Sequence, residues 1–155
     1  MAELVDARDL KSLEALLRWQ ISEHDFIPPT DFIPVAEECG LITALGEWVF
    51  CSSCSQAKKW QDQGFHSLRM AVNISPKQFL DRDIANMMAR TIDECGLNPM
   101  CLDLEITEGL IMQNVERSVA ILSDFRELGG RVAIDDFGTG YSSLSYLKQF
   151  PVDKL

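Results

Sequence analysis

The sequence of 155 residues has only two histidines, few basic residues and no long hydrophobic run. No apolar stretch approaches the roughly 20 residues that a helix needs to cross a bilayer, and no basic segment precedes an apolar one at the N-terminus. We therefore expect a cytoplasmic protein with no membrane segment. The 24 Asp and Glu residues outnumber the 14 Lys and Arg residues, and the formal net charge is −10. Because nucleic-acid backbones are bound through basic side chains, DNA and RNA are not expected partners.

The histidines and cysteines limit the possible chemistry further. His24 and His66 are isolated in the sequence, so they predict neither a catalytic triad nor a histidine metal site. The five cysteines are an odd set, and Cys51 and Cys54 have the spacing of half a zinc site. This pair lies in a strongly helical stretch, and no second pair has the right spacing. We therefore interpret the cysteines as small buried hydrophobic residues.

The composition is that of a globular domain, with 46% hydrophobic and 25% charged residues. Short apolar runs, which we interpret as strands, alternate with stretches of helical periodicity, and no connection shows a hairpin signal. After a first apolar run near Glu14, the predicted strands are 68–74, 101–107 and 131–135. The predicted helices are 31–40, 45–63, 84–95, 115–128 and 142–149, with a loop at 25–30. One strand per helix predicts an α/β fold, a partial (β/α)8 TIM-like barrel with about four βα units.

Acid and amide side chains stand at the ends of the apolar runs. They are Glu14, Asn73, Glu105, Asp135 and Asp136. Asn73 precedes Glu105 by 32 residues and Glu105 precedes Asp135 by 30, which is about the length of one βα unit. Because the carboxyl ends of parallel strands share one face, these oxygens are expected to meet there and to bind a divalent ion. The alternative is that each acid only caps the following helix, but their regular spacing favours metal ligands.

Five motifs resemble those of one known family. They are Glu14-Ala15-Leu16-Leu17-Arg18-Trp19, Phe32-Ile33-Pro34 with Ala36-Glu37-Glu38, Val72-Asn73-Ile74-Ser75, Leu104-Glu105-Ile106-Thr107-Glu108, and Asp135-Asp136-Phe137-Gly138-Thr139-Gly140-Tyr141-Ser142-Ser143. In order and spacing they are similar to the EAL family of cyclic di-GMP phosphodiesterases. The resemblance implies a modified (β/α)8 barrel that hydrolyses one phosphodiester of cyclic di-GMP to linear pGpG, with two Mg²⁺ or Mn²⁺ ions in the complete site.

The resemblance also implies roles for individual residues. The expected ligands of one metal ion are Glu14, Asn73, Glu105 and Asp135, and Asp136 is the expected ligand of the second ion. Of these, Glu14, Asp135 and Asp136 are expected to be catalytic, together with Glu108 as the anchor of the loop from Asp136 to Ser143.

The same motifs imply a binding site for the substrate. Arg18 is similar to an arginine that contacts a substrate phosphate, although a solvent-facing charge at a strand end is the alternative role. Leu16, Phe32 and Pro34, with Ile33 between them, are similar to the walls of the nucleotide pocket.

Both ends of the chain depart from the family pattern. A barrel of this type needs about 250 residues. A later lysine, a water-assisting glutamate and a pocket glutamine of the family are not in this sequence. Residues 1–12 lack the substrate-contacting Gln-Pro pair of the family and resemble the translation of a leucine tRNA gene; the alternative is a trimmed first strand. We therefore distinguish a non-family-like segment, 1–12, from a partial EAL domain, 13–155.

Three functions remain open from the sequence. The first is a phosphodiesterase of which this chain is an incomplete, weakly active or inactive fragment, because the metal ligands are present and later catalytic residues are not. The second is an inactive module that binds cyclic di-GMP or a protein partner, and the third is a remnant reading frame. A second copy of the chain, or an EAL or GGDEF domain, is the expected protein partner. Because a half barrel leaves strand edges uncovered, we also expect marginal stability and self-association.

Overall fold

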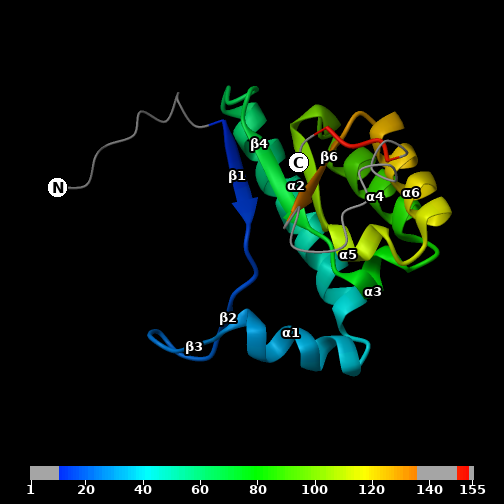
Figure 1. The fold of residues 1–155 in the computed structure, drawn as a ribbon. Coiled ribbons are helices and arrows are strands. Elements are labelled where there is room, and N and C mark those ends of the chain that lie inside the picture. The colour runs from blue at the N-terminus through cyan, green and yellow to red at the C-terminus, as the bar shows by residue number, and fades with distance from the viewer. Residues whose placement is uncertain (1–10, 136–149, 154–155) are drawn as a thin grey trace.

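The structure, a computed structural model, describes residues 11–135 and 150–153, and a parallel sheet of four strands organises this part of the chain (Figure 1). The strands stand in the order β1-β4-β5-β6, and each neighbouring pair is parallel. Their bounds are Ser12–Ala15 for β1, Arg69–Asn73 for β4, Leu102–Thr107 for β5 and Arg131–Asp135 for β6.

Helices connect these strands. The chain forms α1 (Pro29–Glu38) and α2 (Ile42–Asp62) before β4, α3 (Pro76–Phe79), α4 (Ile84–Cys95) and a 3-10 turn (Pro99–Cys101) before β5, and α5 (Glu108–Ile111) and α6 (Val115–Glu127) before β6. Helix α2 packs on β4 and α4, and α4 packs on α6, which contacts β6. Figure 1 shows these three helices together beside the sheet, with β1 at its edge. Within the ranges described, no helix combines the length and hydropathy needed to cross a membrane.

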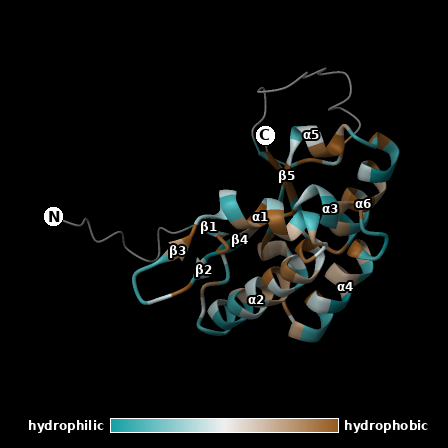
Figure 2. Ribbon diagram, turned by 90° about the horizontal axis from the view of Figure 1, so that it is seen from below, coloured by the Kyte–Doolittle hydropathy of each residue, from teal (hydrophilic) through white to brown (hydrophobic). Residues whose placement is uncertain are grey.

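The two faces of the sheet differ because successive side chains of a strand point to opposite faces. Val72, Leu104 and Val132 lie side by side on β4, β5 and β6 and are at most 1% exposed. Buried helix side chains complete the core on this face, among them Phe50, Met88, Leu122 and Phe125. In Figure 2, α2 and α4 alternate between hydrophobic and hydrophilic positions, as helices with one face on a core do. The polar side chains of the strands are left to the opposite face.

Local sequence accounts for several helix ends. Helix α4 ends at Gly96, whose φ of 59° is the left-handed conformation that favours glycine. Helix α6 follows Asn114, whose side-chain oxygen accepts the N–H of Arg117 at 3.1 Å. Helix α3 begins with a capping box, in which Ser75 Oγ accepts the N–H of Gln78 and Gln78 Oε1 accepts the N–H of Ser75, both at 3.3 Å. This capping box fixes the path of the chain directly after β4.

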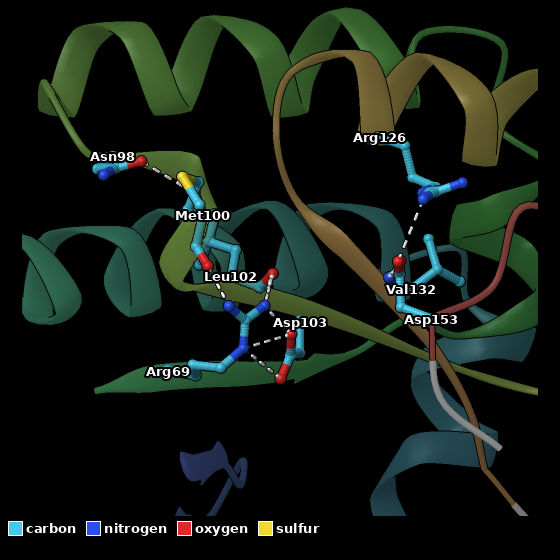
Figure 3. Close-up of polar contacts among 8 residues, drawn as sticks. All are labelled: Arg69, Asn98, Met100, Leu102, Asp103, Arg126, Val132 and Asp153. Carbon is cyan, nitrogen blue, oxygen red and sulfur yellow. Dashed lines mark hydrogen bonds and ion pairs between the residues drawn. The ribbon is translucent and has the colours of Figure 1, made fainter. Parts of the chain in front are cut away.

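Residues 150–153 return to the sheet beside β6. Phe150 is buried in the core, and the N–H of Asp153 donates to the carbonyl of Val132 at 2.9 Å. The carboxylate of Asp153 accepts the N–H of Val132 at 3.0 Å and Nη2 of Arg126 at 3.2 Å (Figure 3). This segment therefore joins the amino end of β6 to α6.

The α/β fold class predicted from the sequence is confirmed. The strand 131–135 and the helix 84–95 have the predicted bounds, and the other predicted elements that the structure describes differ by no more than three residues at either end. The predicted helix 142–149 lies outside the described residues.

The secondary structure departs from the sequence predictions in two places. Between β1 and α1, where no hairpin was expected and 25–30 was predicted as a loop, the strands β2 (Trp19–Gln20) and β3 (Phe26–Ile27) pair antiparallel. Strands of two residues are too short to show an alternating pattern. The helices α3 and α5 were also missed, because four residues are too few to establish helical periodicity.

The cysteines are divided between the core and the surface. Cys54 and Cys101 are buried and Cys51 and Cys95 are half-buried, but Cys39 is exposed. The expectation that the cysteines are buried is therefore wrong for Cys39, which is the C-cap residue of α1 and not part of an apolar helix face. Burial raises the pKa of Cys54 from 9.0 to about 12, and burial also raises the pKa of Cys101.

We expect these thiols to differ in reactivity. Because the thiolate is the reactive form, iodoacetamide at pH 8.5 should label Cys39 readily and Cys54 only when urea unfolds the chain, as measured by peptide mass spectrometry. Between pH 9 and 12 the folded chain keeps the Cys54 proton that the unfolded chain releases, so the free energy of unfolding should fall as pH rises, by about 1.4 kcal/mol per unit. Cys54→Ala should reduce this slope. Labelling of Cys54 in the folded chain at the rate of Cys39 would contradict the prediction.

Gly46 offers a test of the capping box. A Cβ on this residue of α2 would lie 1.5 Å from Nε2 of Gln78, which is buried. We expect Gly46→Ala to displace Gln78 from the capping box and to lower the free energy of unfolding by about 1–3 kcal/mol, measured by urea denaturation. Gly109→Ala in α5 is the matched control, because a Cβ there meets nothing within 4 Å. Equal stabilities of the two variants would refute this role of Gly46.

Candidate functional site

The predicted ligands lie along the carboxyl edge of the polar sheet face. Asn73 ends β4 and lies opposite Glu105 of β5. Asp135 ends β6 and lies two residues after Ala133, which is opposite Glu105. Glu14 of β1 is opposite Ala71, two residues before Asn73. All four side chains lie on one face of the sheet, because each is either opposite its neighbour or offset from that position by two residues along the strand. The structure therefore brings the ends of four strands to one polar edge.

Glu14 and Asn73 are joined by a hydrogen bond between β1 and β4. Nδ2 of Asn73 donates to Oε1 of Glu14 at 2.7 Å, and both residues are exposed. Since the nitrogen of the amide is used in this bond, its carbonyl oxygen is the acceptor that Asn73 offers to a ligand. A carbonyl oxygen beside a carboxylate is the type of donor that hard divalent ions prefer.

The remaining predicted ligands differ in their exposure to solvent. Glu105 is half-buried and Asp135 is exposed, while Asp136 lies outside the described residues. Over 11–135 and 150–153, no three His, Cys, Asp or Glu side chains lie close enough to hold a metal ion together. The fit to a divalent ion therefore depends on donor type and placement, with three carboxylates and one amide on adjacent strands.

A groove of about 350 Å³ begins beside Asn73. Its walls come from the loop after β1, from α1 and α2, and from the ends of β4 and β5, and they include Leu16, Arg18, Ile33 and Thr107. This groove connects Asn73 of the predicted metal edge with Leu16 and Arg18, two of the predicted substrate-binding residues.

A second groove, of about 440 Å³, lies next to the first and is mostly apolar. Arg18 borders both grooves, and Trp19, Phe32 and Trp48 line the second. The ring of Trp19 meets the ring of Phe32 edge to face, with 5.7 Å between their centroids.

The predicted substrate-binding residues therefore have different surroundings. Leu16 is 54% exposed in the first groove, and Arg18 is exposed with Nη1 donating to the carbonyl of Leu17 at 3.0 Å. Phe32 is buried in α1 and borders the second groove, and Pro34 is exposed within the same helix. The structure thus places Leu16 and Arg18, but not Phe32, in the groove that contains Asn73.

Glu108, the predicted loop anchor, is the first residue of α5 and is buried. It follows β5 directly and is three residues beyond Glu105. The loop that it is expected to hold, from Asp136 to Ser143, lies outside the described residues.

Sequence reasoning missed two features of the polar sheet face. Thr107 lies on the same face as Glu105, opposite Asp135, and lines the first groove. Arg69 and Asp103 form an ion pair on the same face, near the amino ends of β4 and β5. The alternation of the strands could have predicted both features. Arg69 is four residues from Asn73, and Asp103 and Thr107 are each two residues from Glu105, so all three side chains belong on the face of the predicted ligands.

A parallel α/β sheet with oxygen donors along its carboxyl edge, and a groove that leads away from them, defines a barrel-type α/β domain whose functional site lies at the strand ends. The chain belongs to the EAL domain family, whose model matches residues 4–155. The resemblance stated from the motifs is therefore confirmed. The match begins inside the segment 1–12 that the sequence analysis set apart.

Curated relatives agree with this membership. The chain is 45% identical over 147 residues to the cyclic di-GMP phosphodiesterase PdeR of Escherichia coli, a match that covers 95% of this chain and 22% of PdeR. It is 43% identical over 151 residues to the signaling protein YkoW of Bacillus subtilis, covering 97% of this chain and 19% of YkoW. The chain thus spans about a fifth of the length of these relatives.

Solved structures confirm the TIM-barrel-like fold. The phosphodiesterase PaMucR in complex with c-di-GMP matches with a TM-score of 0.88 and 40% identity, over 92% of this chain and 58% of that one. The EAL domain of FimX from Pseudomonas aeruginosa, bound to c-di-GMP, has a TM-score of 0.82 at 22% identity and supports the fold alone. The described sheet and helices therefore form part of a barrel of the EAL type.

Proposed function

We propose that this chain is part of a phosphodiesterase that cleaves one phosphodiester of cyclic di-GMP and gives linear pGpG. The observation that carries the proposal is the strand register that places Asn73 opposite Glu105. Asn73 also donates a hydrogen bond to Glu14 and lines the groove that contains Arg18. The named activity of PdeR and the c-di-GMP complex of PaMucR support the choice of substrate.

The donor set supports Mg²⁺ or Mn²⁺ as the cofactor. Glu14, Asn73, Glu105 and Asp135 would hold one ion, and Asp136, assigned from its motif, would hold a second. Divalent ions supply a water of lowered pKa and stabilise the charge that develops at phosphorus during in-line displacement. The contribution of the chain is to carry these oxygens on the ends of paired strands, which hold them more rigidly than a loop would.

The carboxylates also influence when an anionic ligand binds. Two like charges 4 Å apart repel by about 4 kcal/mol at an effective dielectric constant of 20. Glu14, Glu105 and Asp135 would therefore repel a phosphodiester until a cation neutralises them. We expect the divalent ion to be required for tight binding of the dinucleotide.

Arg18 and Leu16 supply the contacts that we assign to the substrate. The guanidinium of Arg18 is exposed at the groove, and its planar set of donors suits the oxygens of a phosphate. Leu16 and Ile33 offer apolar surface for a nucleotide base in the same groove. The roles of Phe32, Pro34 and Glu108 stay predictions, as does the cytoplasmic location.

The second candidate function is binding without hydrolysis, either of cyclic di-GMP or of a protein partner. The observation that favours association with a partner is the apolar second groove of about 440 Å³. Exposed apolar side chains at the second groove, including Trp19, Leu41 and Trp48, also favour association with a second copy or with an EAL or GGDEF domain.

Calorimetric titration of the 155-residue chain with cyclic di-GMP, combined with chromatographic detection of pGpG, separates these functions. We expect binding in Mg²⁺ that is at least about tenfold weaker in chelator, because the ion neutralises the carboxylates. Glu105→Gln should weaken binding to a similar degree. Glu47→Gln is the control, since Glu47 pairs with Arg90 on the helices at 3.0 Å and should leave binding unchanged.

Each result has a defined meaning for the two candidates. Metal-dependent binding with pGpG formation supports the enzyme, and metal-dependent binding without product supports the binding module. Absence of binding in Mg²⁺ and Mn²⁺ would contradict both the enzyme and a module that binds cyclic di-GMP, and would leave association with a protein partner as the second candidate.

Asn73→Asp tests the metal edge without the nucleotide. In chelator, this variant replaces a hydrogen bond to Glu14 with a repulsion between two carboxylates, so we expect the free energy of unfolding to fall by about 1 kcal/mol. Added Mn²⁺ should restore the stability, because the new carboxylate is a stronger ligand than the amide. Circular dichroism at increasing temperature measures both effects.

Ser22→Asp is the matched control for this variant. Ser22 Oγ donates to Oδ2 of Asp25 at the same distance, 2.7 Å, in an exposed loop of the β2–β3 hairpin. The free energy of unfolding of Ser22→Asp should fall in chelator and should not recover when Mn²⁺ is added. Equal recovery of both variants would show a general effect of the ion and would count against a metal edge at Asn73.

A further inference from the structure

An ion pair links β4 to β5 at the end of the sheet opposite the metal edge. Arg69 is the first residue of β4, and its Nε donates to both carboxylate oxygens of Asp103, at 2.9 and 3.0 Å. Nη2 also donates to the Asp103 carboxylate and, at 3.0 Å, to the carbonyl of Leu102, and Nη1 donates to the carbonyl of Met100. Figure 3 shows the guanidinium enclosed between these carbonyls and the carboxylate. We call this set of bonds the Arg69 clamp.

The clamp is largely shielded from solvent. The side chains of Arg69 and Asp103 are 16% and 17% exposed, unlike the ion pair of Lys58 and Asp62 on α2, which is 35% and 63% exposed. Exposed ion pairs contribute little to stability, whereas a shielded arginine that uses most of its donors holds its partners in one geometry. The clamp can therefore fix the position of β5 along β4.

That position decides which residues meet at the metal edge. Arg69, Asn73, Asp103 and Glu105 lie on the same face, and in the observed register Asn73 is opposite Glu105. A slip of one residue would turn the apolar side chains of β5 to the wrong face, so the core forbids it. A slip of two residues keeps every side chain on its face but places Asn73 opposite Asp103 or Thr107.

The apolar pattern does not exclude this second slip, because Leu102, Leu104 and Ile106 are all buried aliphatic side chains with the same spacing. A slip of two residues would break the Arg69 clamp, since its carbonyl partners Met100 and Leu102 move together with Asp103. The clamp thus favours one of two registers that would bury equivalent apolar side chains in the core.

We propose that Arg69 is a positioning residue of the site, which holds Asn73 level with Glu105 by fixing the β4–β5 register. Its effect on the metal ion depends on the proposed function, but its effect on the register does not. The two can therefore be tested separately with the full chain.

The variants are Arg69→Met, which removes the charge and the donors, and Arg69→Lys, which keeps the charge but loses the planar fork. In metal-free protein, NMR should show that Arg69→Met loses or weakens the cross-strand contacts between residues 73 and 105. Amide exchange in β4 and β5 should become at least about tenfold faster, while α6 keeps its wild-type rate. Calorimetry with Mn²⁺ should give an affinity about tenfold weaker for Arg69→Met and an intermediate value for Arg69→Lys.

Lys58→Met is the matched control, because it removes the same charge and an ion pair that lies within one helix. It should change neither the contacts between residues 73 and 105 nor the Mn²⁺ affinity. Unchanged contacts and unchanged β4–β5 exchange in Arg69→Met would overturn the positioning role, whatever the Mn²⁺ result. Altered contacts in a chain whose wild type binds no Mn²⁺ would support the positioning role and count against the proposed function.

Discussion

The register of the parallel sheet is the constraint on which the rest of the structure depends. Each strand sends alternate side chains to the core and to the polar face, so one alignment must satisfy both. At the level of Val72, Leu104 and Val132 the helices bury the apolar face almost completely. The same alignment puts Asn73 opposite Glu105 on the other face. The core and the candidate site are therefore two consequences of one set of backbone pairings.

The two ends of the polar sheet face carry different groups of side chains. At the amino ends, Arg69 and Asp103 neutralise each other and tie β4 to β5. At the carboxyl ends stand the carboxylates of Glu14, Glu105 and Asp135, and Arg18 lines the groove that begins beside Asn73. Oxygen donors held on paired strands suit a divalent ion, because a rigid donor set binds a cation without reorganisation.

The sequence predicted the longer elements well because their signals are local. Helix α4 has apolar residues at helical spacing, and Gly96 marks its end, so its bounds could be predicted to the residue. The ligand residues could be proposed because oxygen donors recur at strand ends. The β2–β3 hairpin could not be predicted, since its pairing of Trp19 with Ile27 involves strands of only two residues. The burial of Phe32 against Trp19 likewise depends on how α1 meets that hairpin.

By itself, the sequence determined the family, the order of the longer strands and helices, and the side chains that stand at the strand ends. These properties follow from short motifs and from the periodicity of residues within a single helix or strand. Only the tertiary structure decided which of those side chains meet, that Leu16 and Arg18 share a groove with Asn73, and that Phe32 faces a different one. The physical reason is that strand register is set by contacts between distant residues, such as Arg69 with Asp103, which are 34 positions apart.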